Sequence, residues 1–277
     1  MYLRKIMIKW KITSWRYSRD CCVIKMDGSF EEIITGTYEA ISADFNRSRG
    51  TKPWKPLVHY LEIAGKEKKL ASGPIPVLLD AGCGNLRNAA IFMDFFSPQH
   101  YIGLDLSFSL LSTNISRWKG ERSVHGINAS ISKLPFRSGT MHIIASIAAL
   151  HHAHEKQAIQ GYFEEFWRIL AKHEGTPLVI VSVWRKWQKR FRKKIIKQTL
   201  RSMASFGAHE EPGLVNVPWK NSKTSKLHPR HYLLLSKREV RKLVESKFRI
   251  LSWEMLGGPG GKDNFFFCLY PIINSPR

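Results

Sequence analysis

The sequence is poor in acidic residues. Its 277 residues include 44 lysines and arginines but only 22 aspartates and glutamates, which gives a formal net charge of +22 at pH 7. An excess of this size points to a polyanionic partner, either a nucleic acid or an anionic membrane surface. The alternative is a basic surface that is solvated and has no partner.

Cysteine is scarce as well. The four cysteines, Cys21, Cys22, Cys83 and Cys268, form no CxxC pair and have no spacing that would supply four zinc ligands. This usage favours a reducing cytosol over an oxidising compartment. We therefore predict a cytoplasmic protein with no metal site.

Long hydrophobic runs are missing too. No apolar stretch approaches the roughly 18 to 20 residues that span a bilayer, and residues 1–19 alternate cations with apolar residues instead of forming the core of a secretory signal. Residues 1–35 are predicted to be a basic extension. It could be a β-hairpin, a basic arm or the product of a misassigned start codon, and the sequence does not decide among these.

From residue 36 the pattern becomes regular and predicts one domain that extends to residue 277. Two short amphipathic helices are expected over 37–48 and 53–64, with Pro53 in the first turn of the second. Apolar strands and amphipathic helices then alternate, and a glycine turn precedes the final strand. We predict an α/β fold with a doubly wound, mostly parallel seven-stranded sheet and one antiparallel strand.

Residues 185–230 interrupt this alternation and are predicted to be a basic insertion. Residues 185–201 carry nine cations and no acid. The spacing of Trp184, Trp187, Phe191 and Ile195 predicts an amphipathic helix over 184–200, with Lys186 among the cations on its other faces. Such a helix suits phosphate contacts, although a membrane-surface helix has the same composition.

The stretch LLDAGCGN carries the clearest ligand-binding signal. It places Asp80 at the end of a predicted strand and Gly82 and Gly84 in the turn before a helix, where parallel sheets bind ligands. Arg87 stands where a dinucleotide motif would have its third glycine. Asp105 ends the next strand, where a carboxylate can accept both hydroxyls of a ribose. Acid, GxG and acid at successive strand ends resemble the class I methyltransferases that use S-adenosylmethionine.

That resemblance implies a set of cofactor-binding residues: Asp80, Gly82, Cys83, Gly84, Asp105, Leu106, Ser130, Tyr38 and Lys52. The glycine turn would hold the amino-acid part of the cofactor and Asp105 its ribose. Two positions depart from the pattern. Leu86 stands where such loops often have another glycine, and Ser130 replaces an acid, so its hydroxyl would supply one hydrogen bond to the adenine amino group.

A closer resemblance covers most of residues 38–245. The segments YEAISADFNRSRGTKPWKPLVHYL, GLDLSFSLL, LPFRSG, SIAALHH, NVPWK and RHYLLLSKREVRKLV are similar to the family that methylates the carboxymethyl group on the wobble uridine of tRNA. The resemblance implies two partners, the tRNA anticodon loop and a small zinc-binding activator subunit. We expect no membrane partner.

Candidate residues for the methyl acceptor follow from this resemblance. They are Arg49, His151, Trp219, His231 and Tyr232, and the basic helix adds Arg190 and Lys193 as contacts to the tRNA. We assign Arg49 to the reacting carboxylate, because a guanidinium fork matches a carboxylate, and His151 to the modified base or its carboxylate, because a histidine at a strand end can hydrogen-bond the acceptor. The alternatives are a surface arginine and a histidine that caps a strand, and Trp219 is as compatible with a core position as with base stacking.

The chemistry needs no general base. A carboxylate with a reference pKa near 4 is already ionised at neutral pH, so an aligned and dry pocket is sufficient for attack on a sulfonium methyl group. Two other functions remain open from the sequence. One is a methyltransferase of this fold that acts on a small molecule or another RNA site, and the other is an RNA-binding protein without activity.

Overall fold

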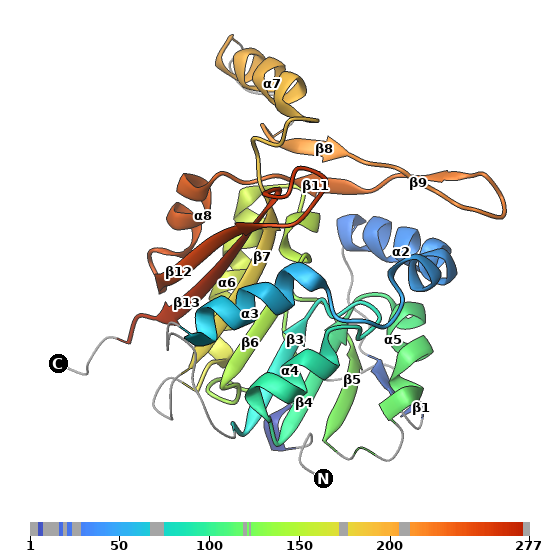
Figure 1. Cartoon of the computed structure of the whole chain (residues 1–277), viewed down its shortest axis with the longest axis vertical. Helices are drawn as coiled ribbons and strands as arrows, with labels where there is room; N and C mark the ends of the chain where they lie inside the picture. Colours follow the sequence, from blue (N-terminus) through green and yellow to red (C-terminus); the bar gives the residue numbers. More distant parts are fainter. Residues whose placement is uncertain are drawn as a thin grey trace.

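A central β-sheet dominates the computed structural model (Figure 1). The structure describes residues 5–7, 17–18, 21–23, 29–66, 75–118, 121, 123–171, 177–204 and 211–273. Nine strands follow the order β1-β2-β5-β4-β3-β6-β7-β13-β12. Their bounds are β1 Tyr17–Ser18, β2 Cys21–Val23, β5 Val124–Asn128, β4 His100–Asp105, β3 Val77–Ala81, β6 Ile143–Ile147, β7 Leu178–Trp184, β13 Asn264–Pro271 and β12 Phe248–Leu256.

Seven of these strands form the predicted sheet. The five strands β5, β4, β3, β6 and β7 are parallel, whereas β13 runs antiparallel to both β7 and β12. This confirms the doubly wound, mostly parallel architecture. The short strands β1 and β2 form an antiparallel pair, which agrees with the β-hairpin alternative for the N-terminal extension, and β2 adds them to the edge of the sheet by pairing in parallel with β5. Most of the N-terminal basic segment lies outside the described residues.

Helices cover both faces of the sheet. On one face lie α3 (Lys55–Lys66), α4 (Ala89–Phe96) and α5 (Phe108–Ile115), and on the other lie α6 (Lys156–Ile169) and α8 (Lys237–Val244). Strand β3 is buried along its whole length, with Leu79 facing the α6 side and Leu78 the α3 side. A strand covered on both faces must be apolar throughout, which explains the continuous apolar run in the sequence.

The N-terminal helices differ in extent from the prediction. Helix α2 (Ser29–Arg49) begins eight residues before the expected start at residue 37 and crosses the predicted domain boundary at residue 35. Helix α3 leaves Pro53 outside its first turn, which Pro56 occupies instead. The division into an extension and a methyltransferase domain stays a prediction.

The helix predicted over 184–200 is wrong in its first half. Trp184 belongs to β7, because its backbone pairs with Asn264 of β13, and α7 (Arg192–Ala204) begins only after the next seven residues. Beyond α7, the insertion forms two antiparallel pairs. These are β8 (Leu214–Asn216) with β11 (His231–Leu233), and β9 (Trp219–Lys220) with β10 (Leu227–His228). In Figure 1 this region and α7 extend beyond one end of the sheet.

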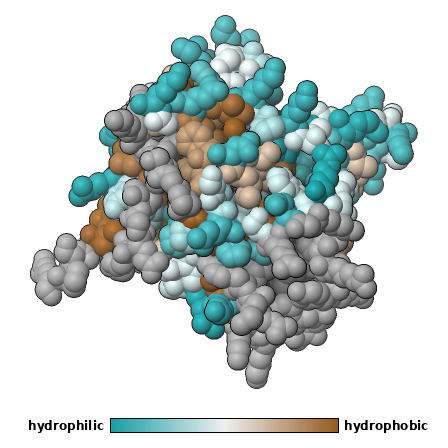
Figure 2. All heavy atoms as spheres, turned by 60° about the horizontal axis from the view of Figure 1, so that its bottom comes forward, coloured by the Kyte–Doolittle hydropathy of each residue, from teal (hydrophilic) through white to brown (hydrophobic). Residues whose placement is uncertain are grey.

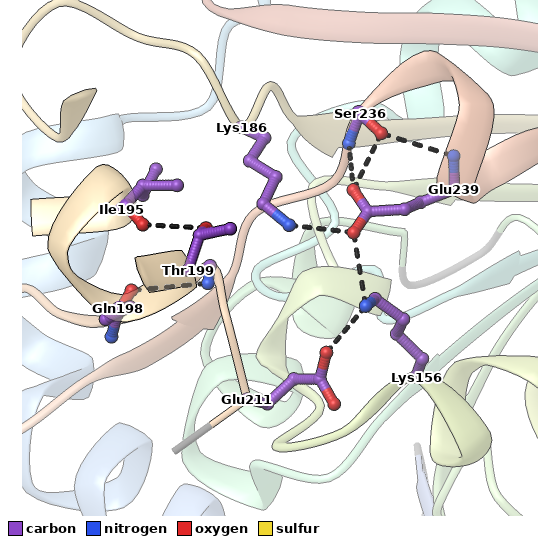
Figure 3. Close-up of polar contacts among 9 residues, drawn as sticks. Lys156, Lys186, Ile195, Gln198, Thr199, Glu211, Ser236 and Glu239 are labelled. Atoms are coloured by element: carbon purple, nitrogen blue, oxygen red, sulfur yellow. Dashed lines mark hydrogen bonds and ion pairs between the residues drawn. The ribbon is translucent and has the colours of Figure 1, made fainter. Parts of the chain in front are cut away.

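A partly buried ion-pair network fastens the insertion to helices α6 and α8 (Figure 3). Glu239 of α8 accepts hydrogen bonds from Lys186 at 2.7 Å and lies 3.1 Å from Lys156, which also pairs with Glu211 at 2.6 Å. Glu239 also closes a capping box with Ser236. Lys186 was expected on a solvated basic face, but it is buried, because its side chain reaches Glu239 from the start of the insertion.

One face of the molecule shows how hydrophilic and hydrophobic residues are distributed on the surface. Among the coloured residues in Figure 2, hydrophilic side chains project along the rim and hydrophobic ones gather in smaller patches between them. No helix in the described ranges is both long enough and apolar enough to cross a membrane.

The ion-pair network predicts a pH-dependent contribution to stability. Hydrogen bonds from Lys186 and Ser236 lower the pKa of Glu239 to about 2 although burial opposes them. Because the pKa is lower in the folded state, the stabilisation is present above the unfolded value near 4.5 and is lost as pH falls towards 2. Glu239→Gln should lower the free energy of unfolding by about 3 kcal/mol at pH 7.

Urea unfolding at pH 7 and pH 3 measures this difference. The gap between wild type and Glu239→Gln should shrink by about 2 kcal/mol at the lower pH. Glu245→Gln, on the exposed end of the same helix, is the matched control and should leave stability unchanged at both values. An equal gap at pH 7 and pH 3 would contradict the ion-pair explanation.

Candidate functional site

A cavity of about 460 Å³ lies where the parallel strands end. Its wall contains loops after β3, β4, β5 and β6, one face of α2, residues of the insertion and the loop between β12 and β13. The carboxyl ends of parallel strands meet at one edge, which is where open α/β sheets bind ligands. The volume falls within the range of small-molecule and cofactor sites.

The glycine turn after β3 is held by hydrogen bonds to β4. The amides of Gly82 and Cys83 donate to Leu104 O at 2.7 and 3.0 Å, and the amide of Gly84 donates to Asp105 Oδ2 at 2.7 Å. Gly82 has a φ of +80°, and a Cβ there would lie 2.3 Å from the Cβ of Ala149. Since all three amides are engaged within the protein, the turn offers no cradle of free donors for a pyrophosphate.

Leu86 stands where loops of this kind often have a glycine, and Gly103 leaves room for its side chain. Its φ of +58° is in the left-handed region, which costs a non-glycine residue about 1–2 kcal/mol. The side chain is nevertheless buried, because Gly103 of β4 lacks a Cβ that would lie 2.3 Å from Leu86 Cδ2. The loop therefore keeps its shape with a leucine at this position.

Two carboxylates occupy successive strand ends. Asp105 accepts the amides of Gly84 and Ser107, one on each oxygen, at 2.7 and 2.9 Å. Burial raises the pKa of Asp105 to about 6 despite these two bonds. Asp80 lies beneath the turn and accepts the hydroxyl of Tyr101 at 2.7 Å, and burial raises its pKa to about 7.

Helix α2 forms one wall of the cavity. Glu31, Ile34, Tyr38, Phe45 and Arg49 line it at helical spacing. The helix is fixed by Glu39, whose carboxylate accepts hydrogen bonds from residues 107 and 109 at the start of α5. These contacts keep one continuous face of α2 against the strand ends.

Beyond Asp105, at the end of β5, the hydroxyl of Ser130 donates to the carboxylate of Glu31. The same hydroxyl lies 2.8 Å from Ser132 Oγ and accepts the amide of Ser132 at 3.0 Å. Glu31 was not among the residues predicted from the sequence. It is 99 positions away from Ser130, and no local pattern connects the two.

The two histidines after β6 are neutral. His151 Nδ1 accepts the backbone amide of Trp184 at 3.3 Å, so its Nε2 carries the proton. Burial, followed by the neighbouring His152, lowers the pKa of His151 well below its usual value. Burial and Arg230 lower the pKa of His152 to about 3, and its Nε2 lies 3.0 Å from the hydroxyl of Tyr38. Both imidazoles lack a positive charge at neutral pH.

Beside the histidines, aromatic rings alternate with guanidinium groups. Trp184 stacks on Tyr232 with ring centroids 4.2 Å apart and an interplanar angle of 5°. Arg190 lies 4.6 Å from the ring centroid of Trp184, and Arg230 lies 5.4 Å from that of Tyr232 and 4.8 Å from that of Trp219. The cavity is therefore acidic at β3 to β5 and basic at the insertion.

The predicted site residues fall into three groups. Those that line the cavity are Tyr38, Arg49, Gly82, Cys83, Gly84, Asp105, Leu106, Ser130, His151, Arg190 and Tyr232. Asp80, Trp219 and His231 lie behind its wall, with Trp219 against Arg230 and His231 in ring contact with Phe30. Lys52 is exposed on the loop after α2, and Lys193 is exposed on α7. Their functional roles stay predictions.

Arg230 is a further residue that the sequence did not reveal. It lines the cavity together with Arg49 and Arg190, and all three guanidinium groups lower the pKa of Tyr232, which burial raises. Three cations thus lie close enough to act on one buried ring. The only signal in the sequence was the position of Arg230 directly before HYLLL.

Comparisons with known proteins agree with this geometry. A methyltransferase domain is matched over residues 78–173. The tRNA (carboxymethyluridine(34)-5-O)-methyltransferase ALKBH8 of Macaca fascicularis is 28% identical over 167 residues, which cover 60% of this chain and 22% of that protein. The chain thus corresponds to less than a quarter of the length of this curated relative.

Solved structures show the same fold. Magnesium protoporphyrin IX methyltransferase of Synechocystis PCC 6803, with bound S-adenosylmethionine, has a TM-score of 0.57 at 11% identity and covers 89% of this chain and 99% of that one. A Haloferax volcanii methyltransferase in complex with the Trm112 methyltransferase activator has a TM-score of 0.58 at 11% identity, with coverages of 88% and 100%. The chain has the fold of the class I methyltransferases, with the methyltransferase match inside it at residues 78–173.

S-adenosylmethionine is the cofactor that this domain and fold indicate, and the residues present fit it. The amides of Gly82, Cys83 and Gly84 are engaged within the protein, whereas Asp105, which lines the cavity, places a carboxylate where a ribose would lie. Each oxygen of Asp105 accepts one amide and keeps capacity for one hydroxyl. The donor set therefore favours an adenosyl sulfonium over a dinucleotide.

The raised pKa of Asp105 predicts pH-dependent cofactor binding. Only the ionised carboxylate accepts from both ribose hydroxyls, and with a pKa of about 6 roughly a tenth of the carboxylates are ionised at pH 5. The Kd for S-adenosylhomocysteine should therefore rise by about tenfold between pH 8 and pH 5, as measured by calorimetry.

Asp105→Asn isolates this effect from Asp80, which titrates in the same range. The variant should bind weakly at pH 8 and vary less with pH. Asp94→Asn, exposed on α4, should keep the wild-type profile. Wild-type affinity of Asp105→Asn at pH 8 would sink the assignment of the ribose to this carboxylate.

Proposed function

We propose that this methyltransferase esterifies the carboxymethyl group of a modified wobble uridine in tRNA. The observation that carries the proposal is the group of three guanidiniums, Arg49, Arg190 and Arg230, in the cavity wall beside two neutral histidines. Arginine binds a carboxylate through parallel hydrogen bonds, and an aromatic surface suits the base that carries it. The similarity to ALKBH8 supports the same acceptor.

The residues of this chain place the acceptor rather than activate it. When bound, the cofactor supplies a methyl group on a positively charged sulfur. A carboxylate oxygen of the acceptor uses a lone pair to form the new bond to carbon, and the electrons of the broken bond remain on sulfur. No proton moves, so neutral His151 and His152 serve as hydrogen-bonding groups and not as bases.

Charge loss favours transfer in a site that excludes water. A cationic donor and an anionic acceptor become neutral, and such a change is helped by desolvation and alignment. Helix α2 and the β12–β13 loop form part of the cavity wall at the strand ends. The arginines hold the acceptor, and Asp105 holds the donor.

We propose two macromolecular partners, the tRNA and a small zinc-binding activator subunit. The cations of α7 support the first, since Arg192, Lys193, Lys194, Lys197 and Arg201 are all exposed. The Haloferax complex with a methyltransferase activator supports the second. A cytoplasmic location stays a prediction.

Nucleoside mass spectrometry tests the reaction. The protein, with and without a candidate activator, is incubated with S-adenosylmethionine and tRNA that contains carboxymethyluridine. That nucleoside should gain one methyl group, which mild alkali removes again because it is an ester. A gain on another nucleoside, or only on small carboxylic acids, would replace the proposed acceptor.

Arg49→Ala should lower kcat/KM for this tRNA by roughly 10- to 100-fold, because a charge-assisted hydrogen bond to the acceptor is lost. Arg238→Ala, which removes an exposed arginine of α8, controls for net charge and should leave the rate unchanged. Binding of S-adenosylhomocysteine should be the same in all three proteins. Full activity in Arg49→Ala would remove this residue from the acceptor site.

The basic helix α7 should act through phosphates and not through the reaction. The double variant Lys193→Ala/Lys197→Ala is expected to weaken tRNA binding and to reduce the slope of log K against log salt by about two. Filter binding between 50 and 200 mM salt measures the slope. The matched pair Arg238→Ala/Lys242→Ala on α8 should not change it, and an unchanged slope in the α7 variant would exclude α7 from the RNA interface.

A further inference from the structure

The hydroxyl of Ser130 has no capacity left to accept a ligand. A hydroxyl has one proton and two lone pairs. Ser130 donates its proton to Glu31, because a carboxylate accepts. Its contact with Ser132 Oγ must therefore have Ser132 as the donor, and the amide of Ser132 uses the second lone pair.

Ser130 therefore has no lone pair left to accept a hydrogen bond from the adenine amino group, which was the role expected for it from the sequence. The carboxylate of Glu31 uses one oxygen to accept the bond from Ser130. A carboxylate has about four acceptor positions on its two oxygens, so further hydrogen bonds remain possible. Both residues line the cavity.

The order of the strands would place the adenine of the bound cofactor beside Glu31 and Ser130. The glycine turn follows β3, Asp105 ends β4, and Ser130 follows β5, which is the next strand in the sheet. With the amino-acid part on the turn and the ribose on Asp105, the base continues towards β5. Leu106 and Ile131 line the cavity there and supply apolar contacts for its faces.

We propose that Glu31 is the cofactor-binding residue that accepts the exocyclic amino group of adenine, and that Ser130 positions its carboxylate. The acid that a strand-end residue would supply thus comes from the first turn of α2. The proposal concerns the cofactor alone, so it does not depend on which molecule receives the methyl group.

Hydrogen bonds between α2 and the start of α5 hold Glu31 in place, so that its carboxylate can distinguish an amino group from a carbonyl group. Eight residues along the helix, Glu39 accepts the hydroxyl of Ser107 at 2.9 Å and the amide of Ser109 at 3.1 Å. These bonds join α2 to the start of α5, which follows directly after Asp105 at the end of β4. The position of Glu31 relative to Asp105 is thereby fixed through two elements and not through a flexible side chain alone.

The test compares S-adenosylhomocysteine with S-inosylhomocysteine, in which a carbonyl replaces the amino group. Calorimetry on the full chain should show that wild type prefers the adenosyl ligand by at least about tenfold. Glu31→Gln should bind S-adenosylhomocysteine about tenfold more weakly and lose most of the preference, because its amide can donate to the carbonyl. Ser130→Asp in the Glu31→Gln background should restore the preference.

Glu32→Gln, at the adjacent exposed position, is the matched control and should behave as wild type. An unchanged preference in Glu31→Gln would overturn the proposal, and so would an equal loss for both ligands, which indicates a structural role only. If Ser130→Ala abolished the preference while Glu31→Gln kept it, the acceptor would be Ser130. Failure of tRNA methylation together with the expected calorimetry would reject the proposed acceptor and leave this proposal standing.

Discussion

The parallel pairing of five strands is the constraint on which the site depends. It brings the ends of β3, β4, β5 and β6 to one edge, where β3 and β4 end with Asp80 and Asp105, Ser130 with its partner Glu31 lies after β5, and histidines follow β6. The insertion adds arginines to the opposite side of the same cavity. A cationic donor and an anionic acceptor can therefore meet between Asp105 and Arg49 without either carrying its charge into an apolar pocket alone.

The position of Arg190 on the basic side of the cavity depends on an ion pair that lies outside the cavity. Asn264 pairs with Trp184 and extends β7, and Lys186 then enters the interior, where Glu239 neutralises it. Such a pair is costly to break, because one charge would remain buried without a partner. The ion pair thereby fixes where the chain leaves the sheet, and Arg190, four residues later, is directed over the face of Trp184.

Sequence patterns predicted the parts of the site that follow directly from strand ends. Asp105 and the glycine turn could be located because an apolar run, an acid and a glycine are contiguous along the chain. The segment after Trp184 was misassigned, because helical spacing of apolar residues competes with a strand pairing that is visible only in three dimensions. Glu31 and Arg230 were missed for the same reason, since Ser130, which bonds Glu31, and His152, on which Arg230 acts, are distant from them in sequence.

The adjacent histidines are neutral although guanidinium groups line the same cavity. Burial makes protonation of His152 less favourable, and the guanidinium of Arg230 acts in the same direction. The arginines remain charged and the imidazoles neutral, so the histidines do not add to the positive charge and can still hydrogen-bond. His151 is fixed in this role by the backbone of Trp184, which occupies Nδ1. For an acceptor that is already an anion, a neutral donor beside a cation orients the carboxylate without protonating the oxygen that must react.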